Sequence, residues 1–185
     1  MKKIRIGLMG AGFMGKAHSH AFHSIPYMFN PKTYEIELAG ICASTPESAQ
    51  KGAERFGFQK AYSSFDEMLA DGEITVFDNA GPDPTHYPTV MQAIRQGKHI
   101  YCEKPIAINS GQAKEMYTAA DAAGLVHMAG FNCRFFPANL LARKLIQEGA
   151  VGKILHTRFL YDQQYGASET LKAEDIWYNN VGKAD

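Results

Sequence analysis

The sequence predicts an α/β protein built on a doubly wound parallel sheet, and two observations carry this prediction. Short apolar runs such as 74–79 (ITVFDN) have the pattern of buried strands, and they alternate with longer segments of helical pattern. Marked loops follow the expected strands at 10–15, 81–86, 103–105 and 130–134. Because open parallel sheets bind ligands outside the carboxyl ends of their strands, these loops are expected to form the functional site.

The stretch 3–21 (KIRIGLMGAGFMGKAHSHA) organises the chain. It begins with the apolar alternation of a strand, and Gly10, Gly12 and Gly15 then form the pattern G-x-G-x-x-G. In a dinucleotide-binding turn the first glycine permits the tight turn, the second lets the backbone approach a pyrophosphate, and the third lets the helix pack on the strand. The amino end of the helix offers free N–H groups to phosphates. The stretch predicts dinucleotide binding; the alternative is a structural turn that binds nothing.

Strands and helices are expected to alternate along the rest of the chain. The expected strands are 34–43, 61–62, 74–79, 98–103 and 126–130. The expected helices are 14–24, 48–56, 65–69, 84–96, 110–123 and 137–148. Pro26 should end the first helix, Gly57 the second and Gly97 the fourth. Ser64 and Glu67 have the spacing of a capping box at the start of the third helix.

Composition excludes several classes of protein. The 185 residues suffice for one domain, or for one domain and part of another, and an apolar share of 45% suits a sizeable core. The formal net charge is zero and the basic residues are scattered, so neither nucleic acid nor a membrane surface is an expected partner. No apolar run is long enough for a transmembrane helix, and the early first strand leaves no room for a signal peptide.

The cysteines and histidines do not have metal-ligand spacing. The three cysteines are Cys42, Cys102 and Cys133. They lie far apart in apolar surroundings, which predicts free thiols in a reducing, cytoplasmic compartment. His18, His20 and His23 do not share one face of the first helix, so a metal cluster is not expected. His18 is nearest to the glycine turn and is a candidate to face the cofactor cleft; a surface or packing role is the alternative.

The character of the sequence changes after Gly152. Residues 153–165 alternate as an extended segment, which predicts the first strand of a second, antiparallel sheet. Because one strand cannot form a stable sheet, we expect an incomplete, truncated α+β substrate domain whose exposed edges favour a homo-oligomer. The chain is thus expected to hold a dinucleotide-binding domain, a joining strand and helix, and the start of a substrate and dimerisation domain. These segments are 1–123, 124–150 and 151–185.

Five segments together resemble one known family. They are 10–15 (GAGFMG), 81–86 (GPDPTH), 103–105 (EKP), 130–135 (GFNCRF) and 149–154 (GAVGKI). Their order resembles the glucose–fructose oxidoreductase, inositol dehydrogenase and MocA (Gfo/Idh/MocA) family of NAD(P)-dependent sugar oxidoreductases. The Glu-Lys-Pro triplet at a strand end is far more specific than the glycine turn alone. The resemblance implies a Rossmann NAD(P)-binding fold for most of the chain.

The resemblance implies roles for the matching residues. Lys104 resembles the family lysine that contacts the nicotinamide ribose and the reacting hydroxyl, which must lose a proton together with its hydride; a surface lysine in a turn is the alternative. Glu103 is expected to position the ribose and Lys104, and a cis peptide bond is expected before Pro105. Asn132 and Arg134 resemble substrate-contacting residues of the active-site wall, although Arg134 could instead hold the domain junction together.

The cofactor site extends over several loops. The residues expected to bind the cofactor are Gly10, Gly12, Phe13, Met14, Gly15, Ser44, Thr45, Gly81, Pro82, His86, Glu103 and Lys104. Pro82 and His86 resemble the nicotinamide-side loop of the family. NAD-preferring members carry an acidic residue near position 43, where it binds the ribose 2′-hydroxyl and repels a 2′-phosphate. Ala43 removes this repulsion, and Ser44 and Thr45 could donate to a phosphate. The expected cofactor is NAD(P), with NADP slightly favoured.

The expected function is hydride transfer between nicotinamide and a hydroxyl of a small-molecule sugar or polyol. The alternative is a non-catalytic regulatory protein that binds dinucleotide or sugar on the same fold. The resemblance also implies a D-x-x-x-H pattern in the substrate domain, and none follows Tyr165, since Asp175 lacks a suitably placed histidine. We therefore expect this piece, as an N-terminal fragment of the enzyme, to bind cofactor but to turn over sugars poorly.

Overall fold

A computed structural model describes residues 2–29 and 34–162. Contacts divide the chain into two units, Met1–Gly130 and Phe131–Asp185. The predicted joining segment 124–150 is thereby shared between the units: its strand pairs with the sheet of the first unit, whereas its helix belongs to the second. None of the helices in the described ranges is long and apolar enough to cross a membrane.

The first unit is built on a six-stranded parallel sheet with the strand order β3-β2-β1-β4-β5-β6. The strands are β1 (Lys2–Met9), β2 (Tyr34–Cys42), β3 (Lys60–Tyr62), β4 (Val76–Asn79), β5 (His99–Cys102) and β6 (His127–Ala129). The chain starts in the middle of the sheet and winds outward first to one edge and then to the other. The order reverses between β1 and β4, and ligands of open α/β sheets bind at such a reversal. The predicted fold class is confirmed.

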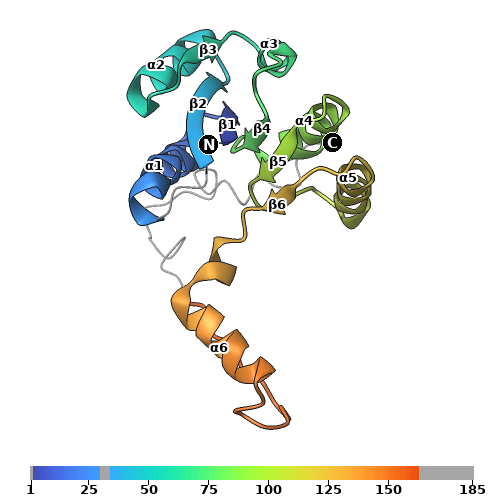
Figure 1. Cartoon of the computed structure of the whole chain (residues 1–185). Helices are drawn as coiled ribbons and strands as arrows, with labels where there is room; N and C mark the ends of the chain where they lie inside the picture. The colour runs from blue at the N-terminus through green and yellow to red at the C-terminus, as the bar shows by residue number, and fades with distance from the viewer. Residues whose placement is uncertain (1, 30–33, 163–185) are drawn as a thin grey trace, which may run out of the picture. The chain divides into compact units, whose positions relative to one another are not determined.

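Helices cover both faces of this sheet (Figure 1). Those of the first unit are α1 (Phe13–Met28), α2 (Pro46–Phe56), α3 (Phe65–Ala70), α4 (Asp83–Arg95) and α5 (Ser110–Ala122). α1 contacts α2, and α4 contacts α5, so each pair packs beside the strands that it connects. The second unit contributes the 3-10 helix η1 (Asn132–Phe135) and α6 (Pro137–Gln147), which contact each other.

Two groups of buried apolar side chains form the core. One group joins β1 and β2 to α2 and the segment after it: Ile6, Leu8, Leu38, Ile41, Ala53, Phe56 and Phe58. The other joins β4 and β5 to α3, α4 and α5 and includes Met68, Ile74, Phe77, Val90, Ile94, Ile100 and Met116. Burial of the sheet on both faces explains apolar runs such as 38–42, the buried half of β2.

Side-chain caps fix the starts of α2 and α3 close to where the sequence places them. The Thr45 hydroxyl oxygen accepts from the Ser48 backbone N–H at 3.1 Å, at the start of α2. The Ser64 hydroxyl oxygen accepts from the Glu67 N–H at 3.2 Å, at the start of α3. The Glu67 carboxylate turns back to the N–H of Ser63, at 3.0 Å, instead of that of Ser64. The caps satisfy N–H groups that a helix leaves unpaired at its amino end.

The predicted end of the first helix at Pro26 is wrong. α1 continues to Met28 and holds Pro26 within its last turn. The missing N–H of a proline removes a single hydrogen bond there. The next turn still closes, because the Phe29 N–H donates to the Ile25 carbonyl at 3.1 Å.

The predicted strand 153–165 is also wrong over its described part. Residues 153–162 have no regular secondary structure, and residues 163–165 lie outside the described ranges. A strand is defined by its hydrogen bonds to a neighbouring strand. No segment in the described part of the second unit supplies such a partner, so alternation of side chains alone does not produce a strand here.

Candidate dinucleotide site

The glycine turn joins β1 to α1 through very close backbone contacts. Gly10 has a φ of +104°, and a Cβ on it would lie 2.6 Å from the Ala80 carbonyl oxygen, so only glycine fits. A Cβ on Gly15 would collide with the carbonyl oxygen of Gly10. These two contacts confirm the tight turn after the strand and the close packing of the helix on the strand.

Gly12 differs from its two neighbours in the motif. Its φ of −78° and ψ of −158° suit any residue, and a Cβ there would meet no protein atom within 4 Å. The fold itself therefore does not require glycine at this position, which leaves space for a ligand. α1 also has no side-chain cap and no acidic residue in its first turn. Free N–H groups at a helix start beside an open backbone fit the pyrophosphate of a dinucleotide.

The two residues after Gly12 are partly open to solvent. Phe13 is 83% exposed, and Met14 is half-buried. An apolar ring left so exposed at the first turn of α1 is compatible with covering a bound ligand. Ser44 and Thr45 are exposed at the carboxyl end of β2, at the same end of the sheet as the glycine turn.

The loop after β4 is held together by a buried histidine. The His86 ring is completely buried, with Nε2 3.0 Å from the Gly81 carbonyl oxygen and Nδ1 2.7 Å from the Pro105 carbonyl oxygen. The Gly81 N–H donates to the Asn79 side-chain oxygen at 3.0 Å. Pro82 is exposed and is the residue before α4. His86 thus connects the loop after β4 to the segment after β5, rather than presenting its ring at the surface.

The Glu-Lys-Pro segment directly follows β5. The Glu103 N–H donates to the Asn79 carbonyl at 2.9 Å, which continues the pairing of β4 with β5. The Glu103 carboxylate accepts the backbone N–H of Lys104 at 3.1 Å, through Oε2. The peptide bond between Lys104 and Pro105 is cis, as predicted. Glu103 is buried and Lys104 is half-buried, so the segment presents the lysine rather than the carboxylate.

His18 extends from α1 to two carboxylates of the sheet. Its Nδ1 lies 3.0 Å from both carboxylate oxygens of Asp78, and its Nε2 lies 3.2 Å from Oε1 of Glu103. Burial alone would lower the pKa of His18, but the hydrogen bonds and charges of the two carboxylates outweigh it and raise the pKa to about 9. Burial acts to raise the pKa of Glu103, yet its hydrogen bonds with His18 and the Lys104 N–H lower it overall.

The sequence reasoning missed Asp78. It lies within the apolar strand β4, completely buried, where it was counted only as part of a strand. An aspartate inside a buried strand needs a hydrogen-bonding partner, so its position was the available signal. The partner, His18, is 60 residues earlier in the chain, and pattern reasoning does not connect residues at that separation.

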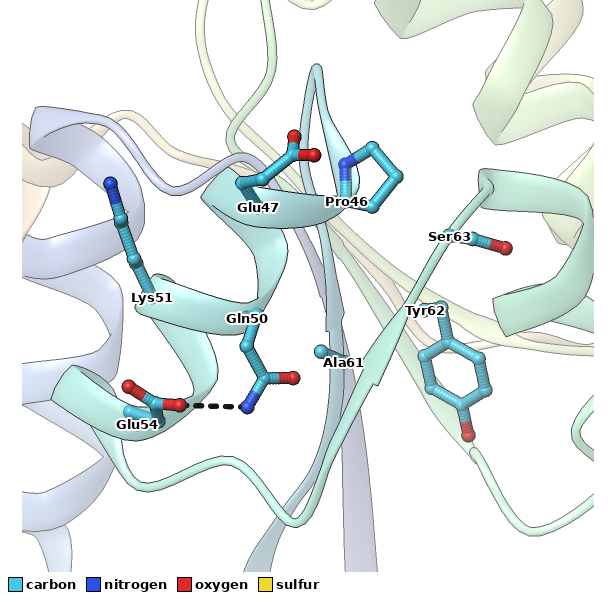
Figure 2. A pocket seen from close by; sticks show the side chains of 8 residues that line it. All are labelled: Pro46, Glu47, Gln50, Lys51, Glu54, Ala61, Tyr62 and Ser63. Carbon is cyan, nitrogen blue, oxygen red and sulfur yellow. Dashed lines mark hydrogen bonds between the residues drawn. The ribbon is translucent and has the colours of Figure 1, made fainter.

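A hollow of about 580 Å³ lies between α2 and the β3 segment (Figure 2). Its lining residues are Pro46, Glu47, Gln50, Lys51, Glu54, Ala61, Tyr62 and Ser63. Lys51, the nearest lysine to Thr45 in sequence, shares this hollow with two glutamates. Thr45 uses its hydroxyl to cap α2. The hollow therefore offers no concentrated positive charge for a 2′-phosphate.

The two substrate candidates belong to the second unit. Asn132 and Arg134 both lie on η1, and the Arg134 N–H donates to the Phe131 carbonyl at 3.1 Å. Their contact with substrate stays a prediction. All of the cofactor candidates belong to the first unit, at the carboxyl ends of β1, β2, β4 and β5.

Residues 4–131 match the family described as "Oxidoreductase family, NAD-binding Rossmann fold". The chain belongs to the Gfo/Idh/MocA family of oxidoreductases. Among its relatives is levoglucosan dehydrogenase of Pseudarthrobacter phenanthrenivorans, which is 41% identical over 167 residues, or 90% of this chain and 43% of the relative. Another is trans-1,2-dihydrobenzene-1,2-diol dehydrogenase of Mus musculus, 28% identical over 86% of this chain and 46% of the relative.

Solved structures of this family share the fold. The structure of levoglucosan dehydrogenase in complex with NADH and levoglucosan has a TM-score of 0.81 and 42% sequence identity, over 83% of this chain and 41% of the other. A putative myo-inositol dehydrogenase from Sinorhizobium meliloti has a TM-score of 0.68 and 28% identity, over 80% of this chain and 42% of the other. The chain spans less than half the length of these relatives.

Proposed function

We propose that this chain is the dinucleotide-binding part of an NAD(P)-dependent oxidoreductase that transfers a hydride between nicotinamide and a hydroxyl of a sugar or polyol. The observation that carries the proposal is that the glycine turn and the Glu103–Lys104 pair lie at the same end of the sheet. The glycine turn, open at Gly12, lies after β1, and the Glu103–Lys104 pair lies after β5. NAD binding by the family supports the first part of this site.

In this proposal, Lys104 manages the proton of the reacting hydroxyl. When nicotinamide is bound, the hydride would leave from the carbon that bears the hydroxyl, and the hydroxyl oxygen must then lose its proton. A lysine side chain placed beside that oxygen supplies an acid–base group for this proton, and Lys104 is a half-buried residue. Glu103 accepts the Lys104 backbone N–H and so limits where the lysine side chain can start. Asn132 and Arg134 complete the proposal as substrate-contacting residues.

The proposed cofactor range includes both NAD and NADP. Ala43 leaves no carboxylate at the end of β2 to repel a 2′-phosphate, and Ser44 is exposed beside it. A solved relative of this chain contains NADH, which supports NAD as one cofactor. Binding of NADP at least as tight as that of NAD stays our prediction.

The proposed substrates are ring compounds that carry hydroxyl groups. The relatives are named for levoglucosan, a dihydrobenzene diol and inositol. We further propose the division at 1–123, 124–150 and 151–185, a homo-oligomer, and a cytoplasmic location. The cysteines in the described part of the chain are free thiols, which supports a reducing compartment.

Replacement of Gly12 tests the proposed function. Gly12→Val places a branched side chain where the pyrophosphate should lie, without a clash against the protein. Calorimetry with NADH and NADPH should show binding to the wild type and its loss in the variant. Gly72→Val is the matched control, because a Cβ there also meets nothing within 4 Å and Gly72 lies outside the glycine turn. Equal binding by wild type and Gly12→Val would contradict the proposal.

Turnover distinguishes the proposed enzyme from a non-catalytic binding protein on the same fold. Lys104→Met removes the proton-handling group and leaves the glycine turn in place. In the enzyme, it should abolish hydride transfer to polyols, measured as NADH formation in the longer protein to which this chain corresponds. A binding protein would show no such transfer before or after the substitution.

A further inference from the structure

His18 connects three elements of the first unit. It extends from α1 to Asp78 on β4 and to Glu103 after β5, with distances of 3.0 and 3.2 Å. Side-chain exposure is 8% for His18, 0% for Asp78 and 7% for Glu103, so water cannot replace these contacts easily. A carboxylate only accepts hydrogen bonds, so an imidazole that donates to one on each side carries a hydrogen on both nitrogens. The geometry is that of an imidazolium held between two carboxylates.

Tyr101 is a further titratable group beside His18. The Tyr101 ring on β5 lies with its centroid 5.1 Å from that of His18. Burial raises the pKa of Tyr101, and the charges of Asp78 and Glu103 raise it further. Asp78, Glu103 and Tyr101 are titratable groups that face the imidazole from the elements packed against it, and the charge of Lys104 acts on the same Glu103 carboxylate. The described residues contain no group of His, Cys, Asp and Glu that could hold a metal ion.

The Glu103 carboxylate lies between His18, the backbone N–H of Lys104 and Gly130. Oε1 faces His18, and Oε2 accepts the backbone N–H of Lys104. A Cβ added to Gly130 would lie 2.5 Å from Oε1, so the glycine leaves just enough room for the carboxylate. A displacement of this carboxylate would therefore also disturb the backbone at Lys104.

We propose that His18 is a positioning residue that holds the Glu103 carboxylate, and through it the Lys104 backbone, in the arrangement that the nicotinamide half of the dinucleotide requires. The proposal rests on the function proposed above for the Glu103–Lys104 pair. The pyrophosphate half depends instead on the glycine turn, which lies at the amino end of α1, before His18. His18 lies only three residues after Gly15, so α1 supports both halves of the cofactor site with different residues.

The test compares a whole cofactor with the half that lacks nicotinamide. NADH requires both halves of the site, whereas ADP carries only the adenosine and pyrophosphate part. For the full 185-residue chain, His18→Gln should weaken NADH binding by about tenfold, as expected for the loss of a charge-assisted hydrogen bond. ADP binding should stay within about twofold of the wild type, by calorimetry. A residue that only supports folding would weaken both ligands alike.

The pH profile gives a second readout. NADH affinity of the wild type should fall as the pH rises through about 9, where His18 loses its proton, while ADP affinity should not. His18→Gln should remove this step. Tyr101→Phe should keep it, which separates the histidine from ionisation of the tyrosine. His20→Gln is the matched control, because His20 is exposed on the same helix.

A second variant reaches the carboxylate without removing the histidine. Gly130→Ala should push Oε1 of Glu103 away from His18 and give the same selective loss of NADH binding. If His18→Gln fails to fold, as judged by circular dichroism, Gly130→Ala and the wild-type pH profile decide the matter. Equal losses for NADH and ADP, or no loss for either, would overturn the positioning role. A wild type that binds neither ligand would overturn the proposed function itself.

Discussion

Gly10 approaches the carbonyl oxygen of Ala80 so closely that a Cβ on the glycine would lie 2.6 Å from it. The Ala80 N–H in turn donates to the Met9 carbonyl at 2.9 Å, and the Gly10 N–H donates to the Cys42 carbonyl at 2.8 Å. The glycine turn is therefore fixed by the strands on both sides of β1. The sheet therefore holds the glycine turn in place without a ligand. Substitutions at different glycines of this one motif can test folding and binding separately.

The first prediction separates two glycines of the motif by their effect on stability. Gly15→Ala should lower the free energy of unfolding by about 2 kcal/mol or more, because its Cβ would collide with a backbone carbonyl that cannot move away easily. Gly12→Ala should change it by less than about 0.5 kcal/mol. Urea denaturation with equal protein concentrations measures both. A stable Gly15→Ala variant would show that the helix can move away from β1.

The second prediction concerns the choice of cofactor. Ala43→Asp should introduce a carboxylate at the end of β2 that binds a ribose 2′-hydroxyl and repels a 2′-phosphate. The ratio of NADPH to NADH affinity should therefore fall by about tenfold or more in paired calorimetric titrations. Ala43→Asn is the uncharged control and should shift the ratio less. An unchanged ratio in Ala43→Asp would place the 2′-phosphate away from this position.

The third prediction distinguishes two neighbouring hydroxyl groups. Thr45→Ala should lower the free energy of unfolding by about 1 kcal/mol, because the Thr45 hydroxyl oxygen caps α2 through the Ser48 N–H. Ser44→Ala should leave stability unchanged, since Ser44 is exposed, but should weaken NADPH binding. Thermal unfolding and titration of both variants check this. The reverse pattern would assign the phosphate contact to Thr45.

The fourth prediction concerns stability as a function of pH. The pKa of His18 is raised in the folded state to about 9 from 6.5, so its stabilisation is fully present below about pH 6.5 and is lost as the pH rises through about 9. The difference in unfolding free energy between wild type and His18→Gln should be on the order of 2–3 kcal/mol at pH 6 and should shrink towards pH 10. A constant difference over this range would contradict the charged state of His18.

Low pH should also remove the stability contributed by the contact between His18 and Glu103. The pKa of Glu103 is lowered in the folded state, so the stability that its carboxylate contributes is present above its unfolded value and is lost as the pH falls through the folded one. The same two proteins, compared between pH 6 and pH 3, should therefore also converge. Denaturation curves at fixed salt measure both limbs of this profile.

The sequence predicts the parts of the site that depend on local pattern. Glycine spacing, the residues after each strand and a proline after Lys104 are all readable from neighbours in the chain, and the structure confirms the turn and the cis bond. The contacts of His18 with Asp78 and Glu103 join residues 60 and 85 positions apart. Such contacts depend on how α1 crosses the sheet, which no local pattern contains.

The two wrong predictions have local causes as well. Pro26 predicts a helix end, but this near the end of α1 a proline removes only one hydrogen bond and the helix continues to Met28. The alternation over 153–165 predicts a strand, but a strand needs a partner strand, and residues 153–162 have none in the described part of the second unit. Local signals therefore place helix starts well, and they fail where the outcome depends on neighbours in space.

The central place of β1 in the sheet sets an order of assembly during synthesis. β1 pairs with β2 on one side and with β4 on the other, and β4 begins only at Val76. Until β4 has been synthesised, β1 can therefore pair on its β2 side alone. The glycine turn remains open on its β4 side until Ala80 arrives against Gly10. The site proposed for the dinucleotide therefore cannot be complete before both halves of the sheet have been synthesised.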